Sequence, residues 1–185
     1  MKKMLLTGFL AMATMSQAAI TVFLDSTTPS GGGNTAYNYH FEQTPGDVLR
    51  NGDFFTIYDI GGFVSASAPF DFNVSVQNNG LNPSTPVGGV APALDSLMKN
   101  VSFIRAGGST NAMSISGFEI VSTLSGSGGM LAFTGQNAKN QSIQLSNGSL
   151  GAVPGPSPVP EPGTWAMLAS GLGALTISRL RRRTQ

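Results

Sequence analysis

Hydrophobic and polar residues alternate along several stretches of the chain, with the period of two that is typical of a half-buried β-strand. In residues 36–42, Tyr37, Tyr39 and Phe41 alternate with polar neighbours, so these three side chains are predicted to share one face of a strand. Residues 70–77 alternate in the same way, and this pattern places four apolar side chains on one face: Phe70, Phe72, Val74 and Val76.

Two further stretches depart from strict alternation. Residues 53–60 are apolar on both faces, which predicts a central strand that is covered on both sides. In residues 113–121 the apolar positions change phase at Gly117, and this change predicts a β-bulge there. Shorter apolar runs predict four more strands, at residues 20–24, 101–105, 130–134 and 141–145.

Turn residues separate these runs. Asn51-Gly52 predicts a hairpin turn, and Asn79-Gly80 and Asn147-Gly148 predict two more turns. Residues 91–100 are expected to form one short helix that begins at Pro92. The chain is therefore predicted to be all-β, with a single antiparallel β-sandwich domain, jelly-roll-like, at residues 19–150.

The composition agrees with a turn-rich β domain. The chain has 185 residues with 24 glycines, and only 10% of them are charged, against roughly 25% in a typical soluble domain. Six of the ten basic residues lie in the two end segments, so the middle of the chain keeps four basic and eight acidic residues. This negative balance argues against nucleic acid as a partner. The absence of cysteine excludes disulfides, thiolate metal sites and a cysteine nucleophile.

The first 18 residues have the pattern of a signal peptide. Lys2 and Lys3 precede an apolar run of about a dozen residues, which is too short to span a bilayer stably. Small residues follow, and cleavage is predicted between Ala18 and Ala19. Signal peptidase and the Sec machinery are therefore expected partners, and the protein is expected to be exported through the inner membrane.

The other end of the chain has the pattern of a stalk and a membrane anchor. Five prolines alternate with other residues from Pro154 to Pro162, so residues 151–158 are predicted to form an extended Pro-rich linker. A short apolar run at about 164–178 predicts a transmembrane helix, with Trp165 at the outer interface and Arg179 at the inner one. The cluster Arg181, Arg182 and Arg183 predicts that residues 179–185 stay cytoplasmic.

Residues 159–185 resemble the PEP-CTERM sorting tail of Gram-negative bacteria. The resemblance rests on Val159, Pro160, Glu161 and Pro162, followed by the short apolar segment and the arginine cluster. It implies that exosortase, a membrane-embedded enzyme, recognises Pro160, Glu161 and Pro162, and that the inner membrane holds the chain only transiently. It also implies a place at the cell surface or in the extracellular matrix, with a structural or adhesive role in exopolysaccharide and biofilm. Exopolysaccharide is therefore a further expected partner.

The candidate residues for chemistry in the domain are few. His40, the only histidine, lies on the polar side of its predicted strand, and no nucleophile elbow is present. The spacing of Asp47, Asp53, Asp59 and Asp71 matches no calcium loop. The protein is therefore expected to have no catalytic residues, no metal site and no cofactor, and not to be an enzyme.

Two alternatives remain open at this point. A carbohydrate-binding, lectin-like module predicts that Tyr37, Tyr39 and Tyr58 are exposed together, ready to stack on sugars. An envelope hydrolase predicts that His40 lies within hydrogen-bond distance of a serine or a carboxylate in a pocket.

Overall fold

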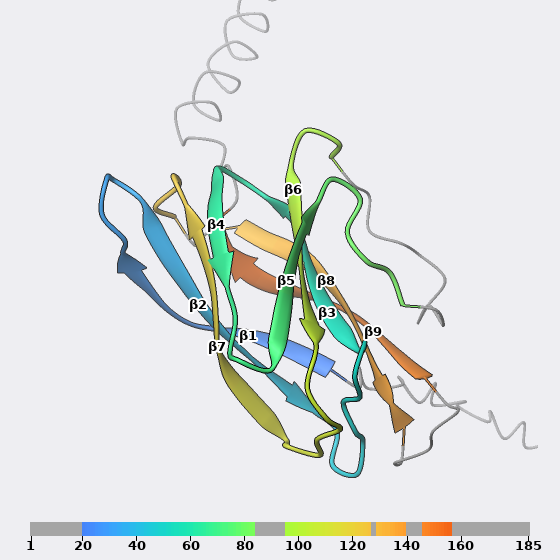
Figure 1. Ribbon diagram of the computed structural model, residues 1–185. Helices are drawn as coiled ribbons and strands as arrows, with labels where there is room; N and C mark the ends of the chain where they lie inside the picture. The colour runs from blue at the N-terminus through green and yellow to red at the C-terminus, as the bar shows by residue number, and fades with distance from the viewer. Residues whose placement is uncertain (1–19, 84–94, 127–128, 140–145, 157–185) are drawn as a thin grey trace, which may run out of the picture.

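Two antiparallel sheets form the domain (Figure 1). The computed structural model describes residues 20–83, 95–126, 129–139 and 146–156. The four-stranded sheet contains, in spatial order, β1 (Ile20–Pro29), β2 (Thr35–Gln43), β7 (Ser114–Ser122) and β4 (Phe63–Ser67). The five-stranded sheet contains, in spatial order, β5 (Phe72–Gln77), β6 (Lys99–Arg105), β3 (Phe54–Ile60), β8 (Gly129–Ala138) and β9 (Ser146–Gly155). The predicted all-β class is therefore confirmed.

The strand pairing contains a long folded hairpin. The pairs β5–β6, β4–β7 and β3–β8 are nested in sequence, and each of them is antiparallel. A jelly roll also contains nested antiparallel strand pairs of this kind. The strands β1 and β9 lie outside this nest and pair with β2 and β8, at one edge of each sheet.

The two sheets face each other across one core of aromatic rings. Phe41 of β2 and Phe118 of β7 point from the four-stranded sheet toward Phe55 of β3, with centroid distances of 5.5 and 4.9 Å. The predicted shared face of β2 is confirmed, because Tyr37, Tyr39 and Phe41 are all fully buried. The core therefore forms because alternate residues of both sheets are apolar and point inward.

β3 is the central strand of its sheet, as its apolar pattern predicts. Its outward-facing Tyr58 is fully buried, because residues 80–82 cross over it. The Tyr58 hydroxyl lies 2.6 Å from the Leu81 carbonyl oxygen and 2.7 Å from Thr134 Oγ1. Gly80 permits this close crossing, since a Cβ there would lie 2.6 Å from the Tyr58 ring.

The predicted bulge at Gly117 is confirmed. The pairing of β2 with β7 shifts register between Tyr39, which faces Phe118, and His40, which faces Ser116. Gly117 is the extra residue, with a φ of +95° that side chains disfavour. The bulge restores the apolar phase, so that Phe118 points into the core.

Several local predictions are wrong. The Asn147-Gly148 turn is absent, because both residues belong to β9 and pair with β8. No α-helix occurs in the described part of residues 91–100, where a turn at 96–97 leads directly into β6. β9 also continues to Gly155, into the stretch where the linker was expected, because an edge strand tolerates proline. The predicted strand at 141–145 lies outside the described residues.

The Asn51-Gly52 turn is present, but it does not close a hairpin. Gly52 has a φ of +88°, and the Asp53 N–H donates to the Arg50 carbonyl at 3.0 Å. The residues before the turn pair elsewhere, since Val48 forms a bridge with Ala138 and Leu49 with Thr110.

Phe70 does not share the buried face of β5. The strand begins at Phe72, and Phe70 is fully exposed in the loop between β4 and β5. This loop carries the chain from one sheet to the other, and the Phe72 N–H donates to the Pro69 carbonyl there at 2.9 Å. The alternating pattern therefore holds only from Phe72 onward.

The described chain begins and ends at opposite ends of the sandwich. Ile20 pairs with Gln43 at one end, which we call the entry end. Pro156 lies at the other end, beside the β3–β4 turn and the last residue of β7, Ser122. We call this the exit end.

Candidate functional site

The residues predicted to carry sorting and anchoring lie outside the described residues. They are Ala18 and Ala19 at the signal cleavage site, Val159, Pro160, Glu161 and Pro162 in the sorting motif, and Trp165, Arg179, Arg181, Arg182 and Arg183 in the anchor. The predicted transmembrane helix at about 164–178 lies outside them too. Within the described ranges, no helix has the length and apolar character needed to cross a membrane.

The structure does fix the point from which the tail leaves the domain. The Pro156 carbonyl accepts a hydrogen bond of 2.8 Å from the backbone N–H of Gly61, in the β3–β4 turn. The Gly61 carbonyl in turn accepts one of 2.6 Å from the Ser122 hydroxyl, which is buried. Only residues 157–159 separate this fixed point from Pro160. Since a fully extended chain spans at most about 3.6 Å per residue, Pro160 can lie no farther than roughly 14 Å from Pro156.

All three tyrosines of the chain are fully buried. The Tyr37 hydroxyl donates to the Leu124 carbonyl oxygen at 2.8 Å. The Tyr39 hydroxyl lies 3.3 Å from the Pro154 carbonyl oxygen. Burial raises the pKa of Tyr37, Tyr39 and Tyr58 above the ordinary value, and the nearby Tyr37 raises that of Tyr39 further. These rings belong to the core and its cover, so they form no exposed platform for sugars.

These pKa shifts predict a loss of stability in alkali. A tyrosine whose pKa is raised in the folded state contributes its full stabilisation at pH values below its ordinary pKa of 10.0. As the pH rises above 10.0, the unfolded chain loses its proton first, so this stabilisation decreases. We therefore expect the urea midpoint to fall between pH 9 and pH 11.5, and to fall less steeply in Tyr39→Phe, which has no ionisable hydroxyl. Equal pH dependence of the variant and the natural protein would contradict this assignment.

His40 lies among two carboxylates and a phenyl ring on the outer face of the four-stranded sheet. Its Nδ1 contacts Asp25 Oδ1, and its Nε2 lies 3.8 Å from Glu42 Oε1. The ring stacks on Phe23 at a centroid distance of 5.0 Å, so His40 is half-buried rather than freely exposed. Asp25 reaches it because β1 shifts register between Leu24 and Ser26. Within the described part of the chain, the polar contacts of His40 are with carboxylates and not with a hydroxyl nucleophile.

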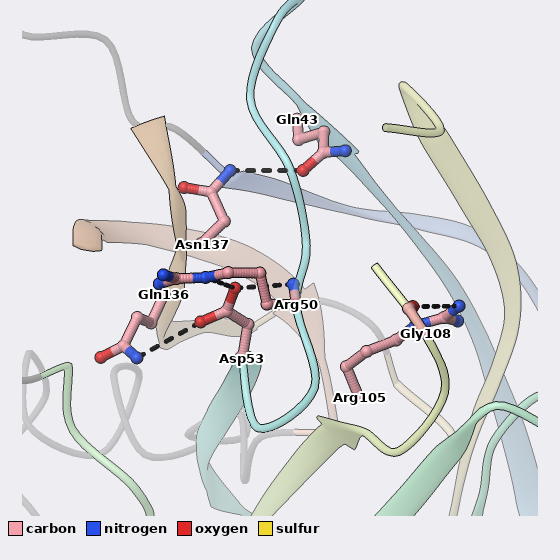
Figure 2. Close-up of polar contacts among 7 residues, drawn as sticks. All are labelled: Gln43, Arg50, Asp53, Arg105, Gly108, Gln136 and Asn137. Atoms are coloured by element: carbon pink, nitrogen blue, oxygen red, sulfur yellow. Dashed lines mark hydrogen bonds and ion pairs between the residues drawn. The ribbon is translucent and has the colours of Figure 1, made fainter. Parts of the chain in front are cut away.

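A second polar group lies at the entry end of the sandwich (Figure 2). The Asp53 carboxylate accepts hydrogen bonds from the Arg50 backbone N–H at 2.8 Å and from its side-chain Nε at 3.4 Å, and Gln136 donates to its other oxygen at 3.4 Å. Asn137 donates to Gln43 in the same layer at 3.3 Å. Asp53 is buried, so these bonds compensate for the loss of water around its charge.

The four aspartates considered as ligands do not form one site. Asp71 forms an ion pair of 2.8 Å with the buried Arg105, and Asp59 accepts a bond of 2.9 Å from the Asp95 N–H at the exit end. Asp47 is buried at the entry end. Among the described residues, no three acidic or histidine side chains lie close enough together to hold a metal ion.

Sequence reasoning missed the buried partners of these charges. Arg105 is nearly fully buried and donates from Nε and Nη2 to the Gly108 carbonyl at 3.1 and 3.0 Å (Figure 2). Its guanidinium also lies 5.3 Å from the centre of the Phe72 ring. Gly108 is only three residues from Arg105, but Asp71 and Phe72 are more than thirty positions away, so no local pattern could reveal those two contacts.

Comparison with known proteins identifies the tail. The PEP-CTERM protein-sorting motif matches residues 158–183. No curated protein and no solved structure matches the chain.

Proposed function

We propose that this PEP-CTERM protein, whose motif implies export and sorting by an exosortase, is a structural or adhesive component of an extracellular polysaccharide matrix. The Sec machinery and signal peptidase would act first on residues 1–18. Exosortase would then act on the tail while the apolar segment holds the chain in the inner membrane. In this proposal the β-sandwich performs its role without catalysis, metal or cofactor.

The sorting motif at residues 158–183 is the observation that carries the proposal. The fixed exit point supports it, because Pro156 is tied to Gly61 and the motif begins only a few residues later. A stalk that starts from a rigid point presents the motif with less conformational freedom than a free terminus would.

The outer surface of the domain supports a non-catalytic role. His40 is held by Asp25 and by stacking on Phe23, and these are contacts that fix a side chain in place. A general base also needs a nucleophile or substrate within hydrogen-bond reach. The carboxylate required by the hydrolase alternative is therefore present, whereas the described contacts include no nucleophile.

The lectin-like alternative has less support. It required exposed tyrosines, and Tyr37, Tyr39 and Tyr58 are buried. The exposed aromatic side chains that the structure describes are Phe23 and Phe70. Phe23 lies on β1 and Phe70 in the loop between β4 and β5, so they form no common surface. Phe23 is also occupied by its stack with His40.

A deletion strain tests the proposed role. We expect it to form less matrix, and we expect complementation with either the natural protein or His40→Ala to restore the matrix equally, because a structural role needs no catalytic histidine. Matrix mass and the amount of the protein in the matrix fraction are the measurements. A folded, exported His40→Ala protein that fails to restore the matrix would favour the hydrolase, and absence of the natural protein from the matrix fraction would rule out the matrix role.

A further inference from the structure

A groove with a volume of about 520 Å³ opens at the exit end of the sandwich. Its walls come from the β3–β4 turn, the start of β6 and the residues after β7. Five apolar side chains line it, and we call it the exit groove: Ile60, Phe63, Leu97, Met98 and Leu124. Leu97 is 90% exposed and has the most exposed side chain of the five.

Hydrogen bonds hold the walls of the exit groove in place. The Gly62 carbonyl accepts a bond of 2.9 Å from the Thr123 N–H. The Leu124 carbonyl accepts one of 2.8 Å from the buried Tyr37 hydroxyl. A groove fixed in this way loses little conformational entropy when a partner binds.

The exit groove lies beside the point where the tail leaves the domain. Gly61, in its wall, donates the hydrogen bond that fixes the Pro156 carbonyl. Four residues can carry Pro160 no farther than roughly 14 Å from Pro156. The predicted membrane segment begins eight residues after Pro156, so it starts within roughly 29 Å. An enzyme that engages residues 160–162 must therefore come close to this end of the sandwich.

We propose that the exit groove is a docking site for the extracytoplasmic surface of exosortase, which places an apolar side chain against Leu97 while it engages the Pro-Glu-Pro triplet. This inference rests on the proposed function, since it assumes that the tail is an exosortase substrate. The short tether makes docking nearly intramolecular once the tail is engaged, so a weak apolar contact is enough to matter.

The charges near the exit groove favour a protein partner over the bilayer itself. Asp59 and Asp95 lie within two residues of the groove residues Ile60 and Leu97. Among the described residues that line the groove, Lys99 is the one with a positive charge. Carboxylates at this end disfavour contact with an anionic lipid surface. A concave groove also fits a protruding side chain better than it fits a flat membrane.

The test uses the full chain in the native cells. Leu97→Asp should slow conversion of the precursor to the mature form by roughly tenfold, the factor expected for losing one well-packed contact. Met113→Asp is the matched control, because Met113 is also an exposed apolar residue but lies at the entry end, where its carbonyl accepts from Gln43. We expect this control to be processed at the natural rate. Resistance of each precursor to mild proteolysis confirms that it is folded.

A linker insertion separates docking from recognition of the tail. Twenty Gly/Ser residues placed after Pro156 add about 25 Å of flexible reach, so the exit groove need no longer lie beside the enzyme. With this insertion, Leu97→Asp and the natural sequence should be processed equally fast. A Leu97→Asp defect that persists despite the insertion would overturn the proposal.

A photo-crosslinking residue at position 97 identifies the occupant. We expect a crosslinked product that contains exosortase. Equal processing of Leu97→Asp and the natural chain overturns the proposal, and so does a crosslink to lipid or to the protein's own tail. A natural chain that keeps its tail intact with exosortase present overturns the sorting function itself, which is a separate result because it does not involve Leu97.

Discussion

Replacing Pro160, Glu161 and Pro162 with alanine is expected to abolish exosortase-dependent processing, so that the uncut precursor accumulates. Each proline fixes φ near −65°, and together they present the Glu161 carboxylate in few conformations. Alanine would remove the charge and restore backbone freedom that costs roughly 1–2 kcal/mol per residue to lose on binding. Loss of a paired carboxylate costs a further 2–5 kcal/mol or so, and the combined effect is a decrease of at least a hundredfold.

Mass spectrometry of the mature protein measures this effect. The C-terminus is compared in cells with and without exosortase, for the natural chain and for the triple variant. Ser157→Ala is the control, because it changes a residue of the same stretch just outside the matched motif, and we expect its processing to be normal. A natural protein that keeps Arg181, Arg182 and Arg183 whether or not the enzyme is present would show that the tail is an ordinary anchor.

Phe118→Ala is expected to lower the free energy of unfolding by about 3–5 kcal/mol, the usual range for a buried phenylalanine. The fully buried Phe118 ring packs against four others at centroid distances of 4.9 to 5.8 Å: Phe41, Phe55, Phe72 and Phe103. These rings belong to both sheets, so the cavity would open in the middle of the sandwich. A loss of this size is a large part of the 5–15 kcal/mol that is typical of a domain.

Urea unfolding of the exported domain, followed by circular dichroism, measures this change. Phe70→Ala is the matched control, since it removes the same side chain from a fully exposed position. Its effect is expected to stay within about 0.5 kcal/mol. A small effect of Phe118→Ala, similar to that of Phe70→Ala, would mean that the two sheets are not held together by this aromatic core.

The sequence alone predicted much of the strand structure. Tyr37, Tyr39 and Phe41 face the core because strict alternation over seven residues leaves one buried face. The apolar character of both faces of β3 correctly predicted its central place, and the phase change at Gly117 correctly predicted the bulge. Each of these features is a property of one strand, so a local pattern records it.

Predictions failed where the local pattern was ambiguous. Asn147-Gly148 is a common turn pair, but pairing with β8 keeps it in an edge strand. Phe70 follows the alternating pattern of β5, but the chain has not yet entered that strand. In the first case pairing with the neighbouring strand outweighs the local turn preference. In the second, the chain is still crossing between the two sheets at Phe70, which the alternating pattern does not reveal.

By itself the sequence determined the fold class and the sorting tail, because both are recorded in the order of neighbouring residues. The fold class follows from the strand period, and the tail from a Pro-Glu-Pro triplet, an apolar run and an arginine cluster in that order. Only the tertiary structure decided that all three tyrosines are buried, that Asp25 meets His40, and that Pro156 is fixed to Gly61 beside an apolar groove. These features join residues that are 15 to more than 100 positions apart, and a chain brings such residues together only when its sheets pair and pack.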